Sequence, residues 1–245
     1  MKIVDTAVKN KLYDVTDDNG VPIPHLVGKV HKSYKQMRSE VDRLYRIQHL
    51  EGVSQIVATK DNIIFLERIE GDDLFNILIK KDYIPEKEIR YIAGCLILIV
   101  KSLHDIGIVH CDIKPENIMY NEIKKQVTLI DFEYGQRTPN YSAPEVLLHN
   151  RNSYESDIWS IGVTIYTLCM GHNPYNDINH MASGIPMHEI STKMSYNAVD
   201  FMNSTMVFDY RDRMTIDECM SHGWFTFEEL EIEEKKEGYF CCQIS

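Results

Sequence analysis

The sequence predicts an α+β fold, with strands in the first part of the chain and helices in the rest. Two strand-like runs, 11–16 and 25–31, flank the turn-forming residues 17–20 and predict a β-hairpin. Two later segments, 34–49 and 86–104, repeat apolar residues at helical spacing and predict amphipathic helices. A chain of 245 residues is long enough for one large domain or two smaller ones packed together.

The composition is that of a globular protein with an acidic charge balance. Apolar residues make up 44% of the chain, and the formal net charge is −11. This charge predicts no direct nucleic-acid partner and favours attraction of a basic polypeptide. The alternative explanation is that the acidic balance only keeps the protein in solution.

The start of the chain and its cysteines predict an intracellular protein of the cytoplasm or nucleus. The first residues hold no apolar core of signal-peptide length, and the longest apolar run, near 96–100, is too short to span a bilayer. Cys95, Cys169 and Cys219 lie in helix-like apolar contexts, and the six cysteines form no metal-type pairs. We therefore expect reduced thiols in the core.

The segment 108–145 carries the residues with the clearest chemistry. Asp112 is followed by Lys114 and Asn117, and Asp131 comes directly after an apolar run. Such groups can accept a proton from a hydroxyl, neutralise growing negative charge and offer Mg²⁺ its preferred oxygen ligands. Phosphoryl transfer needs this combination, because the reaction depends on positioning and charge stabilisation.

Three motifs in this segment resemble the eukaryotic protein kinase family. The family's H-x-D-x-K-x-x-x-N catalytic loop matches residues 110–117, its Asp-Phe-Gly element matches 131–133, and its Ala-Pro-Glu element matches 143–145. Any one of these motifs recurs by chance, whereas all three in order are a strong signal. The alternative for Asp112 and Asp131 is ordinary loop capping.

The resemblance covers roughly residues 25–227 and implies a bilobal protein-kinase-like α+β fold. Residues 1–66 would form a shortened β-rich N-lobe, residues 67–227 a hinge and a complete helical C-lobe, and residues 228–245 an acidic C-terminal tail. The implied cofactors are ATP and Mg²⁺, and the implied partner is a protein substrate.

The resemblance also assigns roles to the residues that match the motifs. Asp112 would be the catalytic base, Lys114 would stabilise charge on the transferred group, and Asn117 and Asp131 would bind Mg²⁺. Lys114 and the run 138–141 resemble the serine/threonine class rather than the tyrosine class. The implied activity is that of an ATP-dependent protein serine/threonine kinase.

A lysine and a glutamate in the first part of the chain are expected to form an ion pair. Residues 27–29 resemble the family's Val-Ala-x-Lys strand, which makes Lys29 the candidate for holding the α and β phosphates, with Lys32 as the alternative. Glu40 lies beside the apolar stripe of the predicted helix, where an unpaired carboxylate is costly. We therefore expect Glu40 to pair with Lys29; otherwise it is an exposed surface glutamate.

Residues 63–75 resemble the kinase hinge, with a strand that leads through a linker into a helix. By this resemblance Leu66 occupies the gatekeeper position. The carbonyl of Glu67 and the amide of Ile69 would bind adenine, and Asp73 would lie near the ribose.

The main departure from the family lies before Lys29. Gly20 and Gly28 are the only glycines in the first 51 residues, so no G-x-G-x-x-G motif occurs there. The family's first strand and its phosphate-covering loop are therefore expected to be missing. Magnesium and Lys29 would then hold the phosphates alone, or a second chain would supply the lid in a homodimer. The trimmed layout is similar to that of kinases from large DNA viruses.

Two further departures lie near the catalytic motifs. Cys111 replaces the arginine that pairs with an activation-loop phosphate in many relatives, and only residues 134–137 remain of that loop. We therefore expect activity without activation-loop phosphorylation. Glu133 replaces the glycine of the Asp-Phe-Gly element and either holds Asp131 inward or disturbs the magnesium site.

Two structural contacts are expected in the helical part. Residues 157–162 match the family's D-x-W-S-x-G helix, whose aspartate, here Asp157, braces the backbone of the catalytic loop. Arg213 precedes the final helix and is the expected buried partner of Glu145.

The last four residues fit the C-a-a-X prenylation pattern with Cys242 as the acceptor, and Cys241 could take a second lipid. The preceding segment is acidic, which opposes binding to an anionic membrane. A membrane partner is therefore expected only if Cys242 is prenylated; the alternative is an ordinary chain terminus.

Two other functions remain open at this point. A pseudokinase would bind a kinase or its substrate without catalysis, and the missing glycine motif favours this reading, whereas the retained catalytic charges oppose it. A small-molecule kinase would use the same scaffold, but the segment 138–145, which resembles the peptide-positioning segment of protein kinases, is intact.

Overall fold

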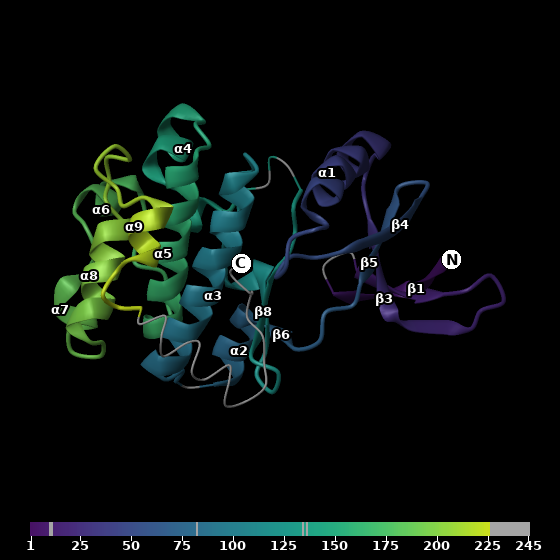
Figure 1. Cartoon of the computed structure of the whole chain (residues 1–245), viewed down its shortest axis with the longest axis horizontal. Helices are drawn as coiled ribbons and strands as arrows, with labels where there is room; N and C mark the ends of the chain where they lie inside the picture. The colour runs from purple at the N-terminus through teal and green to yellow at the C-terminus, as the bar shows by residue number, and fades with distance from the viewer. Residues whose placement is uncertain (10–11, 82, 134, 136, 226–245) are drawn as a thin grey trace. The chain divides into compact units, whose positions relative to one another are not determined.

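The computed structural model describes residues 1–9, 12–81, 83–133, 135 and 137–225. The described residues form two compact units: the first contains Met1–Glu70 and Ile130–Gly135, and the second contains the rest (Figure 1). The first of these segments ends at Glu70, whereas the sequence predicts the end of the N-lobe at residue 66. The predicted tail at 228–245, with its lipidation motif, lies outside the described residues.

The first unit is built on a five-stranded antiparallel sheet with the order β1-β2-β3-β5-β4. Its strands are β1 (Lys2–Lys9), β2 (Leu12–Thr16), β3 (Pro22–Val30), β4 (Ile56–Lys60) and β5 (Ile63–Glu67). Helix α1 (Tyr34–Ile47) packs against β4 and β5 (Figure 1).

The β2–β3 hairpin confirms the one predicted from the turn residues. Asp17 accepts hydrogen bonds from the N–H groups of Asn19 and Val21, both at 2.8 Å. Gly20 adopts a left-handed φ of 85°, which glycine tolerates without steric cost. The side chain of Asp17 and the left-handed conformation of Gly20 thus stabilise the turn.

The expectation that the first strand is missing is wrong. β1 pairs with β2 in antiparallel register, and Ile3 lies opposite Val15. Ile3 also packs against the buried cluster of Val15, Leu26 and Phe65. The sequence does not indicate this strand, because the glycine-rich loop that follows it in the family is absent. The connecting residues 10–11 lie outside the described residues, and neither is a glycine.

Helix α1 confirms the helix predicted from the apolar stripe. Its N-cap is Ser33, whose hydroxyl accepts a hydrogen bond from the N–H of Gln36 at 3.3 Å. Its buried side chains recur at intervals of three and four residues: Met37, Glu40, Leu44 and Ile47. Glu40 is therefore carried on the buried face.

The second unit is mainly helical. Its small sheet contains β6 (Asp72–Asp73), β7 (Ile118–Asn121) and β8 (Gln126–Leu129) in the order β6-β7-β8. Its helices are α2 (Leu74–Lys80), α3 (Glu86–Asp105), α4 (Pro144–His149), α5 (Tyr154–Met170), α6 (Ile178–Ala182), α7 (Met187–Ile190), α8 (Tyr196–Thr205) and α9 (Ile216–Met220). Two 3₁₀ turns, η1 (Pro115–Asn117) and η2 (Pro139–Tyr141), complete it.

The core of the second unit forms around α5. This helix is buried on nearly all sides and contacts α3, α8 and α9 (Figure 1). Gly162 permits the approach of α8, because a Cβ atom there would lie 2.4 Å from the Thr205 hydroxyl oxygen. The predicted apolar face of α3 is confirmed, since all six of its named residues are buried: Ile89, Ile92, Leu96, Ile99, Val100 and Leu103.

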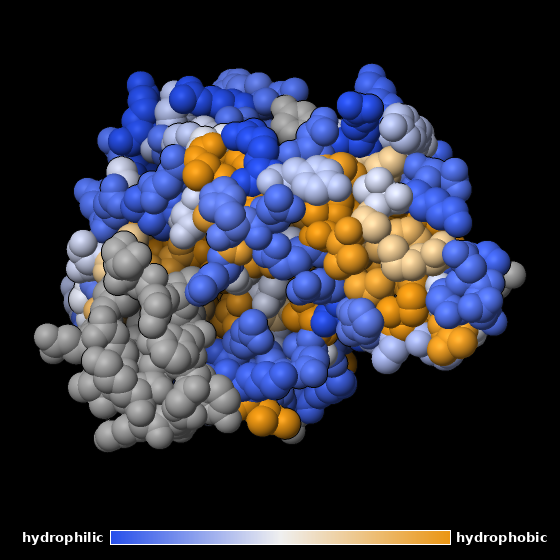
Figure 2. All heavy atoms as spheres, turned by 45° about the vertical axis from the view of Figure 1, so that its right-hand side comes forward, coloured by the Kyte–Doolittle hydropathy of each residue, from blue (hydrophilic) through white to orange (hydrophobic). Residues whose placement is uncertain are grey.

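The cysteines of the described residues are free thiols, as expected. Cys95 and Cys219 are buried, and burial raises the pKa of Cys219 to about 12. Among the described residues, no helix combines the length and the apolar character needed to cross a bilayer. Hydrophilic residues cover most of the face drawn in Figure 2, with hydrophobic residues exposed between them.

Candidate active site

The predicted ion-pair, catalytic and magnesium-binding residues form one connected set in each unit. Lys29, Glu40 and Asp131 belong to the first unit, although Asp131 lies 102 positions beyond Lys29 in the sequence. The second unit holds the catalytic-loop residues Asp112 and Asn117 with their partners.

The first set centres on the ammonium group of Lys29. Its Nζ donates hydrogen bonds to Oε1 and Oε2 of Glu40, both at 2.8 Å, and to Oδ1 of Asp131 at 2.7 Å. Lys29 and Glu40 are buried, so the expected ion pair is present and the alternative of an exposed Glu40 is wrong. Burial lowers the pKa of Lys29, but the charges of Asp131 and Glu40 outweigh it and leave the pKa above its ordinary value. Lys32, the alternative lysine, is exposed.

The strand geometry places Lys29 on a defined face of the sheet. Side chains alternate along a strand, so Val27 and Lys29 point to the same face of β3. Leu66 on β5 lies directly opposite Val27 and therefore shares that face. The residue predicted to be the gatekeeper thus lies on the side of the sheet that carries the lysine.

Glu133 brings a further carboxylate to this set. Its Oε2 lies 4.0 Å from Lys29 Nζ, and its side chain is 11% exposed. Asp131 adopts a left-handed φ of 66°, but Glu133 is not among the described residues with a positive φ. The glutamate therefore replaces the family's glycine without backbone strain of that kind.

The second set centres on the carboxylate of Asp112, which is 5% exposed. Lys114 Nζ lies 2.8 Å from its Oδ2, and the Thr138 hydroxyl donates to its Oδ1 at 2.8 Å. Thr138 also accepts a hydrogen bond from Lys114 at 2.6 Å. The sequence indicated Thr138 only as part of a class-typical run, and its role as a bridge between Asp112 and Lys114 was not predicted.

Asn117 completes this set from the turn η1. Its Nδ2 donates to the backbone carbonyl of Asp112 at 2.8 Å and to the Asp112 carboxylate at 3.1 Å. Its amide oxygen is the atom that can bind a metal. Asn117 and Asp131 each offer a hard oxygen donor of the kind that Mg²⁺ prefers, and their joint role as magnesium ligands stays a prediction.

The backbone before Asp112 is held by the buried carboxylate of Asp157. It accepts hydrogen bonds from the N–H groups of His110 at 2.8 Å and Cys111 at 2.9 Å. His104 Nε2 lies 2.9 Å from the same carboxylate. Cys111 has a left-handed φ of 75°, which is unfavourable for a residue with a side chain and persists only where the surroundings fix it. The predicted brace by Asp157 is therefore present.

The predicted hinge residues have structural partners. The N–H of Glu67 donates to the carbonyl of Gln55 at 3.0 Å, which fixes the end of β5. In the second unit Asp73 is the N-cap of α2 and accepts a hydrogen bond from the N–H of Asn76 at 2.8 Å. Binding of adenine by the Glu67 carbonyl and the Ile69 amide, and of ribose by Asp73, stays a prediction.

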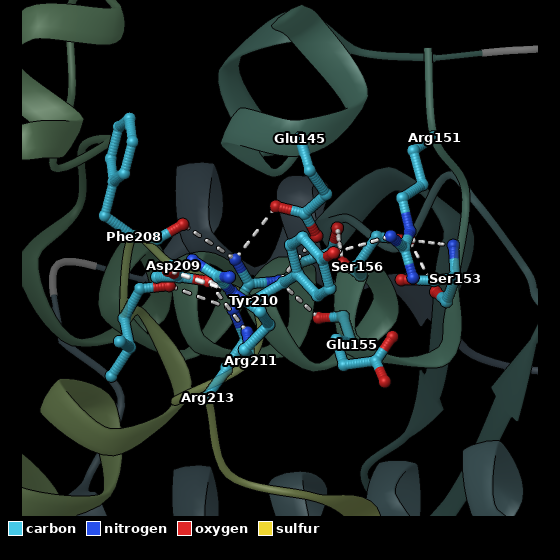
Figure 3. A network of polar contacts seen from close by, with 12 residues as sticks. Glu145, Arg151, Ser153, Glu155, Ser156, Phe208, Asp209, Tyr210, Arg211 and Arg213 are labelled. Atoms are coloured by element: carbon cyan, nitrogen blue, oxygen red, sulfur yellow. Dashed lines mark hydrogen bonds and ion pairs between the residues drawn. The ribbon is translucent and has the colours of Figure 1, made fainter. Parts of the chain in front are cut away.

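The predicted pair of Arg213 and Glu145 is present and buried (Figure 3). Nη1 and Nη2 of Arg213 donate to the two carboxylate oxygens of Glu145 at 2.7 and 3.0 Å. Further hydrogen bonds join Arg213 to the carbonyls of Val207 at 3.0 Å and Glu155 at 2.7 Å. The guanidinium thus links the start of α4 to the segment before α9.

Comparison with solved structures identifies the fold. The chain matches a structure described as the Rad53 kinase domain and SCD2 in complex with AMPPNP, with a TM-score of 0.74 at 23% identity; the match covers 88% of this chain and 86% of that one. This likeness shows a mixed α and β fold with a strand-rich N-lobe and a helical C-lobe.

Sequence comparison identifies the family. The chain is 33% identical over 226 residues to the probable serine/threonine-protein kinase fhkB of Dictyostelium discoideum, which covers 81% of this chain and 20% of that protein. It is 32% identical over 240 residues to the smooth muscle myosin light chain kinase of Gallus gallus, which covers 85% of this chain and 12% of that protein. The chain thus spans a fifth or less of the length of these two relatives. Residues 24–225 match the family model described as the protein kinase domain, and the chain therefore belongs to the protein kinase family.

Proposed function

We propose that this chain transfers the γ-phosphoryl group of ATP to serine or threonine hydroxyls of protein substrates. The observation that carries this proposal is the buried arrangement of Asp112 with Lys114, Thr138 and Asn117. The names of curated relatives as serine/threonine kinases and the complex of a kinase of the same fold with AMPPNP support it.

In this reaction Asp112 orients the substrate hydroxyl and accepts its proton as the hydroxyl oxygen attacks phosphorus. Lys114, held against Asp112 and Thr138, stabilises negative charge on the transferred group. Thr138 keeps both side chains in place through its hydroxyl. Proton acceptance, charge stabilisation and side-chain positioning are thus assigned to Asp112, Lys114 and Thr138, which contact one another in the second unit.

The residues of the first unit serve the nucleotide. Lys29 is held by Glu40 and keeps its positive charge for the α and β phosphates. Asp131 and Asn117 would hold Mg²⁺, which supplies electrostatic stabilisation of the phosphate oxygens when bound.

The alternative is a pseudokinase that binds a kinase or a substrate without catalysis. The absence of glycine between β1 and β2 favours it, because backbone N–H groups of a glycine-rich loop normally bind the phosphates. Each hydrogen bond to a charged oxygen contributes roughly 1.5–3 kcal/mol, so their loss weakens nucleotide binding. A kinase transfers the phosphoryl group to a protein substrate, whereas a pseudokinase does not.

A transfer assay with γ-labelled ATP separates the two functions. The purified chain is incubated with Mg²⁺ and a mixture of basic proteins, chosen because the net charge of the chain is −11. The expected result is label on phosphoserine or phosphothreonine, which disappears when a chelator removes the metal. Label on phosphotyrosine, or no label on any protein, contradicts the proposal.

Activity is further expected not to depend on phosphorylation of the activation loop. Only residues 134–137 separate Glu133 from Thr138, and Cys111 replaces the arginine that would bind such a phosphate. A sample treated with phosphatase and then freed of it should transfer label at the rate of an untreated sample. Loss of transfer after this treatment, restored by rephosphorylation, would contradict the expectation.

An intracellular location is part of the proposal. The four cysteines of the described residues are free thiols, which is typical of proteins in reducing compartments.

A further inference from the structure

A group of metal-binding atoms lies beside Lys29 in the first unit, separate from the predicted magnesium ligands. His31, Glu40 and Glu133 each bring one nitrogen or oxygen atom to the group, and these atoms lie within 4.8 Å of one another. The three side chains are 3%, 2% and 11% exposed, respectively. The group is therefore shielded from water and contains both nitrogen and oxygen donors.

The Nε2 atom of His31 belongs to this group and has no aligned hydrogen bond to any residue that the structure describes. It lies 3.0 Å from Oε2 of Glu40. A buried polar atom without a hydrogen bond is costly, and such atoms in folded proteins commonly indicate an ion or water that binds there. The position of the ring is thus better suited to a metal ligand than to a donor for Glu40.

The local charge also favours a bound cation. The carboxylates of Glu40, Asp131 and Glu133 all lie within 4.0 Å of a single ammonium group, that of Lys29. This concentration of carboxylates close to His31 favours the binding of a cation.

We propose that His31, Glu40 and Glu133 bind a divalent cation of the zinc type. One imidazole and two carboxylates suit Zn²⁺, whereas Mg²⁺ prefers six oxygen ligands. In a tetrahedral zinc site the ligand atoms stand about 3.4 Å apart, as bond lengths of roughly 2.0–2.2 Å require. The ligand atoms of the three residues lie within 4.8 Å of one another, so they would have to move closer together to bind one ion. Three protein ligands leave the fourth position for water.

The site depends on a residue in which this chain departs from its family. Glu133 stands where the Asp-Phe-Gly element has glycine, which offers no ligand. His31 comes two positions after Lys29, directly after the end of β3 at Val30, and its N–H donates to the carbonyl of Asn62 at 2.9 Å. The inference therefore concerns this chain rather than protein kinases in general.

Binding of Co²⁺ to the intact chain tests the site, because tetrahedral Co²⁺ absorbs visible light and Zn²⁺ does not. The metal-free full-length protein is titrated with Co²⁺ without nucleotide, and Zn²⁺ is then added as competitor. We expect one equivalent of tetrahedral Co²⁺ that Zn²⁺ displaces, without the thiolate charge-transfer band that cysteine ligands would produce. A site with that band, or no tetrahedral site, would overturn the proposal.

Three variants assign the ligands. His31→Ala and Glu133→Gln should each weaken Co²⁺ binding at least tenfold, whereas His25→Ala, which changes an exposed histidine of β3, should not. Glu133→Gln preserves side-chain size, so it reports on the ligand even if His31→Ala fails to fold. Equal Co²⁺ affinity in Glu133→Gln and the unchanged chain would overturn the assignment.

Occupation of the site should also weaken nucleotide binding, a consequence that rests on the proposed function. Glu40 is shared by the metal and Lys29, so a bound cation draws its carboxylate away from the lysine. Mg-ATP should bind less tightly to the intact chain after addition of Zn²⁺ than before, and equally tightly to Glu133→Gln under both conditions. Equal weakening in both proteins would contradict this coupling, while the Co²⁺ titration tests the metal site independently.

Discussion

Replacement of Asp112 by asparagine is expected to lower the rate of phosphoryl transfer by about 10²–10⁴-fold, the usual contribution of a positioned general base. Asparagine has nearly the same size and its amide oxygen can still accept the hydrogen bond from Thr138. It cannot take the proton of the substrate hydroxyl. The measurement is the initial rate of label transfer from ATP at saturating substrate, for the unchanged chain and for Asp112→Asn.

A matched control separates this effect from general damage. Asp105→Asn alters an exposed aspartate at the end of α3 that pairs with Lys101, and it should leave the rate unchanged. Unfolding monitored by tryptophan fluorescence verifies that Asp112→Asn is folded. An Asp112→Asn protein that is folded and transfers label at the unchanged rate would remove Asp112 from the mechanism and point to a contaminating kinase.

Replacement of Arg213 by alanine is expected to destabilise the second unit by about 3–5 kcal/mol. The substitution leaves the carboxylate of Glu145 buried without its bidentate partner, and Glu145 is only 4% exposed. Both tryptophans of the chain, Trp159 and Trp224, are buried in this unit. Urea unfolding followed by tryptophan fluorescence therefore measures the stability of this unit directly.

The neighbouring Arg211 provides a control for the loss of an arginine. Arg211 pairs with Asp209 at the surface, where solvent screens the interaction, so Arg211→Ala should change the unfolding midpoint little. The double variant Arg213→Ala, Glu145→Ala should be less destabilised than the sum of the two single variants, because neither charge is then stranded. A midpoint for Arg213→Ala equal to that of Arg211→Ala would contradict the structural role of the pair.

The contacts that follow from contiguous motifs could be predicted from the sequence. The ion pair of Lys29 with Glu40, the brace of Asp157 and the pair of Arg213 with Glu145 all appear as expected. Glu40 is expected to need a partner because it lies beside an apolar stripe, whereas the other two contacts are implied by the motifs that resemble the kinase family.

The first strand could not be recognised by the same reasoning. β1 has ordinary strand composition, but the family's marker for it is the glycine loop that this chain lacks. A search for motifs therefore misses the strand, whereas hydrogen bonding with β2 reveals it. Its pairing depends on the tertiary arrangement and not on a local signal.

The sequence also does not indicate that Thr138 bridges Asp112 and Lys114, or that His31 lies beside Glu40. Thr138 reaches Asp112 across 26 positions, and only the folded chain shows that its hydroxyl bridges the carboxylate and Lys114. His31 lies just beyond the end of β3, so its spacing of two residues from Lys29 gives no reliable direction for its side chain. Its partner Glu133 lies far along the chain, so the cluster could not be anticipated.

The account depends most on one property, namely that a chain without a glycine loop still binds Mg-ATP through its charged groups. Thermal unfolding of the purified protein, with and without Mg-ATP, tests it. A ligand at about 100 times its Kd stabilises the folded state by about 2.7 kcal/mol. We expect the unfolding temperature to rise with Mg-ATP concentration, and to rise less with adenosine, which offers no phosphates to Lys29. An unfolding temperature that does not respond to Mg-ATP at any concentration would contradict the account.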